Sequence, residues 1–247
     1  MKIKVIVVIV ISLLSFKNSA QETKSYSDAW FLLLNNYEFS EKWSGGSEIH
    51  WRNTHFLSKK QQLILRPFIT YSPTESPLAY SIGYSYLRSY PYTENAIPAT
   101  KPEHNIWEQI TLSQAYKELS FSHRFRLEHR FQGNLVMNNN QNYTVDDFSF
   151  SNRFRYRLTV RYPIFNNWFI NIFDELWINM NENFQYPAYD RNWLYLGIGY
   201  EILKNGNIQV AYLHQNIKKS DNLFEVHPTL QFTFQYDFDF RRKEKNQ

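Results

Sequence analysis

Arginine is the residue type whose number and spacing in this chain could most directly do chemistry. It alternates with apolar or aromatic residues through residues 121–131, and again through residues 148–162. The charged side chains of these two segments are Arg124, Arg126, Glu128, Arg130, Arg153, Arg155, Arg157 and Arg161. Guanidinium groups gathered on one face can bind carboxylates through paired N–H donors, and a ring of charged side chains in a pore sets its ion selectivity.

Carboxylates elsewhere in the chain offer partners for this charge ladder. The candidates are Glu48, Glu108, Asp174, Glu175 and Asp190. If they pair with the arginines, the long side chains fill the space between the segments and close it, because buried arginines and carboxylates need one another. The sequence therefore supports two interpretations, an anion-selective constriction and a closed network of ion pairs, and leaves both open.

The elements that must position these side chains are β-strands. In a strand successive side chains point to opposite faces, so one face takes every second residue. Between residues 148 and 162, one face carries Phe148, Phe150, Asn152, Phe154, Tyr156, Leu158, Val160 and Tyr162, and the other face carries the arginines. Helical spacing would mix both classes on every face, so the pattern predicts a strand.

Ten other segments alternate in the same way. The clearest are 121–131 and 229–240, and weaker ones are 31–39, 47–57, 62–71, 79–87, 106–116, 168–180, 192–202 and 208–215. The total is then eleven, whereas bacterial single-chain barrels have an even number of strands. We therefore expect about 10–12 strands, with 12 favoured, and a further strand near residues 21–28.

Three features favour a transmembrane barrel over a soluble, lipocalin-like one. Many segments have ten to fifteen residues, close to what a tilted strand needs to cross a bilayer. Aromatic residues such as Tyr71, Tyr162 and Trp168 lie near segment ends, as they do at a membrane interface. The face opposite the apolar one is too charged for a dry core. The predicted fold class is all-β, an antiparallel transmembrane barrel with a polar, arginine-rich lumen.

The connections between these segments sort by length into two ends. Short connections follow residues 39, 71, 116, 162 and 202, and long ones cover 89–103, 132–146, 181–191 and 216–225. Outer-membrane barrels have short turns in the periplasm and longer loops outside. We therefore expect the last strand to end in the periplasm, with residues 241–247 as a short charged tail there.

The first twenty residues have the layout of a secretory signal peptide. Lys2 and Lys4 precede an apolar run over residues 5–16, which is too short to span a bilayer as a helix, and Ala20 ends the segment. We expect residues 1–20 to be removed and residues 21–240 to form a barrel in the bacterial outer membrane. The expected partners are periplasmic chaperones and the barrel-assembly machinery during biogenesis, and outer-membrane lipid afterwards.

Composition argues against several other classes of protein. The chain has no cysteine, which excludes disulfides and thiolate metal sites. Beyond the signal peptide it carries 24 basic and 23 acidic residues, too even a balance for a nucleic-acid-binding surface. The seven histidines have no metal-ligand spacing, and no glycine-rich phosphate loop occurs. We therefore expect no cofactor, no metal and no nucleic-acid partner.

An outer-membrane lipid hydrolase is the enzymatic alternative, and we do not favour it. Such an enzyme needs a serine and a histidine together on the outer face of the barrel. His123 and His129 have the lipid-facing register, but Ser113 and Ser151 have the lumen register. Ser120 is a further serine near them, and no Gly-x-Ser-x-Gly elbow occurs. We therefore expect no catalytic residues.

Several local patterns occur in an order that resembles an uncharacterised barrel family, domain of unknown function 2490, common in Bacteroidota and related bacteria. The patterns lie at residues 30–34, 48–52, 62–66, 83–84, 103–109, 123–130, 174–175, 191–192 and 197–200. The resemblance covers roughly residues 30–240. It implies an outer-membrane barrel, and it brings no established activity or catalytic residue. The charged tail that follows Phe240 departs from barrels that end on an aromatic residue.

The sequence thus predicts an outer-membrane barrel of unknown specific role. The first hypothesis is a narrow, porin-like channel for small anionic solutes, in which the arginine ladder sets selectivity. The alternative is a non-conducting structural or adhesive barrel that acts through its long outer loops. The two differ in whether the ladder leaves a continuous path for water.

Overall fold

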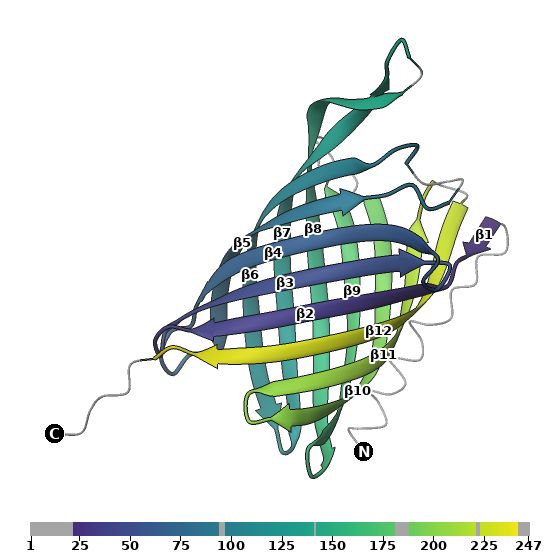
Figure 1. The fold of residues 1–247 in the computed structure, drawn as a ribbon. Helices are drawn as coiled ribbons and strands as arrows, with labels where there is room; N and C mark the ends of the chain where they lie inside the picture. The colour runs from purple at the N-terminus through teal and green to yellow at the C-terminus, as the bar shows by residue number, and fades with distance from the viewer. Residues whose placement is uncertain (1–21, 94–96, 141, 181–187, 221–222, 242–247) are drawn as a thin grey trace.

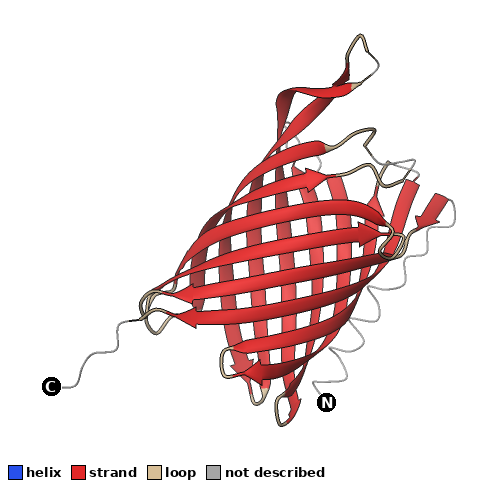
Figure 2. Cartoon of the chain, in the orientation of Figure 1, coloured by secondary structure: helices blue, strands red, loops and turns tan. Residues whose placement is uncertain are grey.

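The computed structural model describes residues 22–93, 97–140, 142–180, 188–220 and 223–241. The predicted signal peptide and residues 242–247 of the predicted tail lie outside these ranges. The described residues form twelve strands and no helix (Figure 2). The strands are β1 (Glu22–Ser25), β2 (Asp28–Glu38), β3 (Trp43–Thr54), β4 (Lys59–Tyr71), β5 (Leu78–Ser89), β6 (Lys101–Tyr116), β7 (Leu119–Met137), β8 (Tyr143–Phe165), β9 (Trp168–Met180), β10 (Ala188–Leu203), β11 (Gly206–Lys218) and β12 (Leu223–Asp239).

Strands β2 to β12 form a closed barrel in which each strand pairs with the next (Figure 1). All of these neighbours are antiparallel except at the closure, where β12 pairs with β2 in parallel. The wall therefore has eleven strands. The predicted fold class is confirmed, but the favoured number of twelve is reached only by counting β1, which does not cross the barrel.

The odd strand number has a local cause at the start of the chain. Residue 22 pairs with residue 223, and residue 28 pairs with residue 229, so β1 and β2 keep one register along β12. They are two parts of a single strand, interrupted at residues 26–27. There the N–H of Tyr26 still donates to the carbonyl of Val226. The strand expected near residues 21–28 thus extends β2 and adds no further crossing.

The two ends of the barrel differ less in connection length than the sequence predicts, because residues 132–137 and 143–146 of one expected long loop belong to β7 and β8, and the four residues between β11 and β12 are fewer than the six between β4 and β5. At the end where β12 terminates, two-residue turns join β6 to β7 and β8 to β9. Lys117 (φ 54°) and Asn166 (φ 47°) have the positive φ that such tight hairpins require. At the other end β7 and β8, the two longest strands, project beyond the wall as a hairpin (Figure 1).

The outside of the wall is apolar, and the inside combines many buried polar side chains with a cluster of buried apolar ones around Trp30, Trp177 and Trp193. On β11, Ile208 and Val210 are exposed, whereas Asn207 and Gln209, which alternate with them along the strand, are buried. Aromatic rings gather near the end with short turns, where Trp43 packs on Tyr71 with 4.9 Å between ring centroids. Within the described ranges, no helix is long and apolar enough to cross a membrane.

Two glycines make room for aromatic rings inside the barrel. A Cβ at Gly83 would lie 2.2 Å from the Trp107 ring, and one at Gly199 would lie 2.1 Å from the Phe169 ring. No side chain tolerates such an approach, so glycine lets these rings lie flat against the wall. Both rings carry an arginine on the face that points into the lumen.

Candidate functional site

The eight residues of the charge ladder lie on the inner face of β7 and β8. In the register of these strands, Arg124 is opposite Arg157, Arg126 is opposite Arg155 and Glu128 is opposite Arg153. Two arginines directly opposite one another on one face repel. The arrangement therefore depends on carboxylates that reach in from neighbouring positions.

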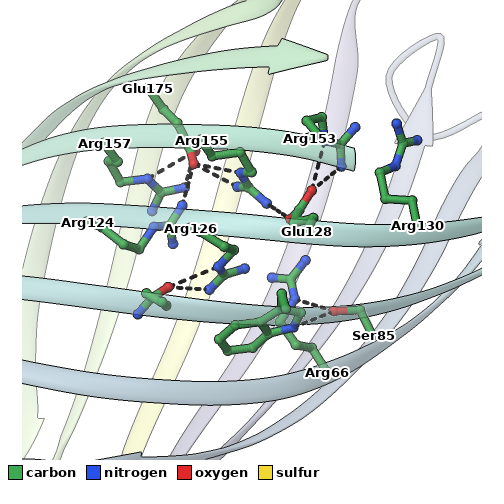
Figure 3. Close-up of polar contacts among 12 residues, drawn as sticks. Arg66, Ser85, Arg124, Arg126, Glu128, Arg130, Arg153, Arg155, Arg157 and Glu175 are labelled. Atoms are coloured by element: carbon green, nitrogen blue, oxygen red, sulfur yellow. Dashed lines mark hydrogen bonds and ion pairs between the residues drawn. The ribbon is translucent and has the colours of Figure 1, made fainter. Parts of the chain in front are cut away.

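Glu175 on β9 supplies the central carboxylate. It is fully buried, and Figure 3 shows three arginines around it. The Nε atoms of Arg155 and Arg157 donate to it at 2.9 and 3.0 Å, and Arg124 makes a third ion pair. A carboxylate can accept about four hydrogen bonds, so Glu175 is well satisfied where it lies.

Glu128 supplies the second buried carboxylate. It accepts from Arg153 Nε at 2.8 Å and from Arg155 Nη1 at 2.6 Å. Because Arg155 contacts both Glu128 and Glu175, the two carboxylates and their arginines form one continuous structure (Figure 3). We call it the paired network, made of Arg124, Glu128, Arg153, Arg155, Arg157 and Glu175.

Aromatic rings of the inner wall stack against the guanidinium groups of several arginines. The guanidinium carbon of Arg155 lies 3.5 Å from the centroid of the Trp177 ring. Arg126 lies over Trp107 at 3.9 Å, and Arg161 lies over Phe169 at 3.6 Å. Stacking on a ring face attracts the cation and holds its plane in place. The arginines are thereby fixed in orientation along the wall.

The remaining ladder residues have partners that the sequence did not predict. Arg130 forms a two-pronged pair with Glu103, at 2.7 and 3.0 Å. Arg161 pairs with Glu201 near the short turns. Arg126 hydrogen-bonds to Gln109 and has no carboxylate partner among the described residues. Neither glutamate was proposed as a counter-charge, although both have the lumen register of their strands.

The five proposed counter-charges divide between the two faces of the wall. Glu48, Glu175 and Asp190 face inward, where Glu48 pairs with Arg66 and Asp190 pairs with Arg153 at 3.3 Å. Glu108 and Asp174 are on the outer face instead, so their proposed role in the lumen is wrong. Glu108 contacts His129 at 3.1 Å, and Asp174 accepts hydrogen bonds from Asn192. Since Asp174 and Glu175 are adjacent in a strand, only one of them can face the lumen.

The outward histidines form polar pairs and no catalytic arrangement in the described residues. His123 contacts the Tyr156 hydroxyl at 2.9 Å, and His129 contacts Asn152 at 2.7 Å. The hydroxyl of Ser151 is buried without a hydrogen-bond partner, so it does not reach His129. Within the same ranges no cluster of three or more histidine, aspartate or glutamate side chains could hold a metal ion.

A second part of the wall is mostly neutral. The inner faces of β11 and β12 carry mainly buried amides and hydroxyls, at Asn207, Gln209, Gln215, Thr229, Gln231 and Thr233, and the buried titratable residues Glu225 and His227 lie on the same face near the start of β12. The amides and hydroxyls hydrogen-bond to one another, as from Gln215 Nε2 to Thr229 Oγ1 at 2.7 Å. The charge of the lumen is therefore concentrated on one side.

The lumen encloses a cavity of about 480 Å³ between these walls. Ten basic and three acidic side chains line it: Arg52, Arg66, Lys101, Arg124, Arg130, Arg153, Arg155, Arg157, Arg191 and Lys219, with Glu48, Glu103 and Glu128. A cavity of this size is in the range of small-molecule pockets. Three further carboxylates behind the lining, Glu175, Asp190 and Glu225, pair with these cations, and ten basic less six acidic side chains still leaves an excess of four positive charges.

A buried histidine lies at the rim on the side of the longer connections, where β2 begins and β3 ends. His227 contacts Asp28 at 2.9 Å and Glu225 at 3.2 Å, and the rings of Tyr26 and Tyr92 pack against it. Burial alone would lower the pKa of His227, but its hydrogen bonds to the two carboxylates outweigh burial and raise that pKa. An imidazolium here joins the first residue of β2 to β12.

Comparison with known proteins gives a family and a distant likeness. The sequence model of the family described as "Protein of unknown function (DUF2490)" matches residues 27–226. No curated protein matches the chain. A solved structure titled "NanC porin structure in rhombohedral crystal form" is similar to it at 13% sequence identity. That match covers 81% of this chain and 93% of the porin chain, with a TM-score of 0.47.

Proposed function

The chain belongs to the DUF2490 family, whose function is unknown, and we propose that it is an outer-membrane barrel whose lumen passes small anionic solutes. The observation that carries this proposal is the charge of the cavity, which ten basic and only three acidic side chains line. Anions entering such a lumen are attracted and cations are repelled, and low-dielectric walls strengthen both effects.

The outer-membrane location rests on the surface of the barrel. Large apolar side chains are exposed around the whole wall, as with Ile82, Ile110 and Leu196. In water this surface would be an aggregation hazard, whereas lipid covers it at no cost. The expected signal peptide, chaperones and assembly machinery belong to the same proposal, with the short turns in the periplasm and the longer loops outside.

Selectivity in this proposal comes from arginines that keep some contact with the cavity. Arg124, Arg130 and Arg157 are each paired on one side and partly exposed on the other. Their remaining N–H donors can replace part of the hydration shell of a passing anion. Because their partners and the aromatic rings fix their positions, these donors need no reorganisation when an anion arrives.

The test is the single-channel conductance of the refolded protein without residues 1–20, in planar bilayers under a salt gradient. We expect steady steps with a reversal potential of the anion-selective sign. Arg157→Gln removes one partly exposed cation and leaves Glu175 two arginines, so selectivity should fall in that variant. Arg88→Gln on the outer face is the matched control and should conduct as the wild type does. The absence of conductance would contradict the proposal, provided that the protein is folded, as shown by gel migration that changes when the sample is boiled.

The second candidate is a non-conducting barrel that acts through its outer loops. It is favoured by the paired network, whose Glu128 and Glu175 are buried, and by the contact of Trp30 with Trp193, which reaches from β2 to β10 inside the barrel. Such contacts narrow the lumen. The same bilayer experiment separates the two candidates, and neither involves an enzymatic activity.

A further inference from the structure

Arg52 on β3 is a buried cation without an anion. Its side chain is 8% exposed, and its hydrogen bonds go to Gln62 at 2.9 Å and His50 at 3.4 Å. It has no ion pair among the described residues. Arg66, Arg155 and Arg191 line the same cavity as Arg52. An isolated buried charge is unfavourable unless something compensates it.

Three tryptophans beside Arg52 form what we call the tryptophan cluster: Trp30, Trp177 and Trp193. Trp193 lies 5.4 Å from Trp30 and 4.6 Å from Trp177 between ring centroids. The guanidinium of Arg52 lies 3.9 Å from Trp30, and that of Arg191 lies 5.0 Å from Trp177. All five side chains line the central cavity.

Four N–H donors of this group are buried and have no hydrogen-bond partner: Arg52 Nε, Arg191 Nε, Trp177 Nε1 and Trp193 Nε1. Buried donors are nearly always satisfied in folded proteins, because an unpaired one loses its hydration without return. Four such donors in side chains that line one cavity, beside a cation without an ion pair in the described residues, point to a ligand that accepts hydrogen bonds and carries negative charge. Because the donor atoms themselves are enclosed by protein, the side chains must shift to receive it.

We propose that Arg52, Arg191 and the tryptophan cluster bind the carboxylate group of a small solute in the lumen. A carboxylate has about four acceptor positions on its two oxygens, so it can accept hydrogen bonds from more than one of these donors. Its single negative charge matches Arg52, the member of this group without an ion pair in the described residues, because Arg191 already pairs with Asp190. A phosphate dianion would exceed that charge.

This proposal deepens the proposed function and rests on it for the route by which a solute reaches the cavity. It names a monocarboxylate as the anion, and it places recognition at β2, β3, β9 and β10 rather than at the charge ladder alone. The neutral amides Gln209, Gln215 and Gln231 line the same cavity. They leave the body of the solute in a polar but uncharged environment.

Intrinsic tryptophan fluorescence of the folded barrel in detergent tests the site, because two of its donors are indoles. Sodium glucuronate and sodium acetate are titrated at constant ionic strength, with inorganic phosphate and neutral glucose as the comparison solutes. We expect saturable binding of the carboxylates. Arg52→Gln should weaken it at least about tenfold, in line with a lost charge-assisted hydrogen bond, and Arg88→Gln should leave it unchanged.

Trp177→Phe keeps an aromatic face for Arg155 and replaces the indole by a smaller ring without an N–H, so it should weaken carboxylate binding severalfold in a barrel that still folds. This variant keeps the test valid if Arg52→Gln does not fold. Equal binding of glucose and glucuronate, tighter binding of phosphate than of carboxylates, or wild-type affinity in both variants would overturn the proposal.

The conductance experiment separates this proposal from the proposed function. Anion-selective conductance without saturable carboxylate binding would support the proposed passage of anions and overturn the carboxylate site. Saturable binding in a folded barrel that does not conduct would support the site and overturn the passage.

Discussion

The paired network and the surroundings of Arg52 lie in one lumen and use the same residue type in opposite ways. In the paired network, four arginines share two buried carboxylates, and each carboxylate bridges at least two of them. Around Arg52, cations and indoles gather, and no carboxylate in the described ranges forms an ion pair with Arg52 itself. In the first arrangement every arginine has a carboxylate partner, although Arg124 Nε is a buried donor without a hydrogen-bond partner, and we interpret this arrangement as structural. The second is incomplete on its own, and an incomplete buried polar group is where a ligand is expected.

The largest effect should come from removing the carboxylate at the centre of the paired network. Glu175→Gln leaves Arg124, Arg155 and Arg157 without the charge that they share. Breaking a buried ion pair by removing one partner costs about 3–5 kcal/mol. Denaturant unfolding in detergent micelles, followed by tryptophan fluorescence, measures the loss. A change below about 1 kcal/mol would mean that water already solvates these arginines, and the contrast with Arg52 would disappear.

The rim offers a third arrangement, in which one buried cation is held between two carboxylates. The raised pKa of His227 means that the imidazolium stabilises the β2–β12 junction fully below about pH 6.5. That contribution is lost as the pH rises through the raised pKa, and Asp28 and Glu225 are then left facing each other with Lys219 near Glu225. Amide exchange at residues 28–31 should therefore accelerate with pH more than base catalysis alone predicts.

His227→Gln should remove that additional pH dependence, because the amide does not titrate. Exchange on β4, away from the junction, serves as the internal control. The same pH profile in wild type and variant would show that another group governs the junction.

Replacing Arg52 should not lower the free energy of unfolding, in contrast to replacing Glu175. Arg52→Met removes an uncompensated cation and keeps an apolar side chain on Trp30, so the free energy of unfolding should stay within about 1 kcal/mol of the wild type or rise. Unfolding is measured without added carboxylates. A loss of more than about 2 kcal/mol would identify Arg52 as a structural residue and bring it into line with the paired network.

The smallest effect is expected where an ion pair of the lumen is open to water. The side chain of Glu201 is 35% exposed in its pair with Arg161, so Glu201→Gln should cost less than about 1 kcal/mol. Comparison with Glu175→Gln then isolates burial, since both substitutions remove one carboxylate from an arginine. Equal losses would show that burial does not distinguish the two pairs.

Alternation was enough to predict the strands and the inward face of the arginine ladder, and segment length, aromatic residues near segment ends and the charge of the inner face were needed for the barrel. The same alternation also indicates lumen residues that were not among the predicted ones. Glu48, His50 and Arg52 occupy every second position of one strand, so Arg52 could have joined the lumen residues on the same argument. The adjacent pair Asp174 and Glu175 could not both have faced inward.

What alternation could not predict are contacts between strands distant in the sequence. Trp30 and Trp193 meet across the interior, and nothing local to either residue indicates it. The barrel closure could not be predicted either, because β1 and β2 have the composition of an ordinary strand. Their parallel pairing depends on the register with β12. Which carboxylate reaches which arginine is decided by side-chain length and strand stagger, and neither can be obtained from periodicity.

The parallel seam between β2 and β12 also restricts how such a wall can change in size. Each inserted or deleted hairpin adds or removes two antiparallel strands, and it leaves the directions of the first and last strands unchanged. The seam then stays parallel and the strand number stays odd. Gain or loss of a single strand would instead make the seam antiparallel and move one chain end to the opposite side of the barrel. Whether the strand number is odd or even thus depends on the β2–β12 junction alone. Related barrels that keep this parallel seam would have nine, eleven or thirteen strands and not the even numbers between them.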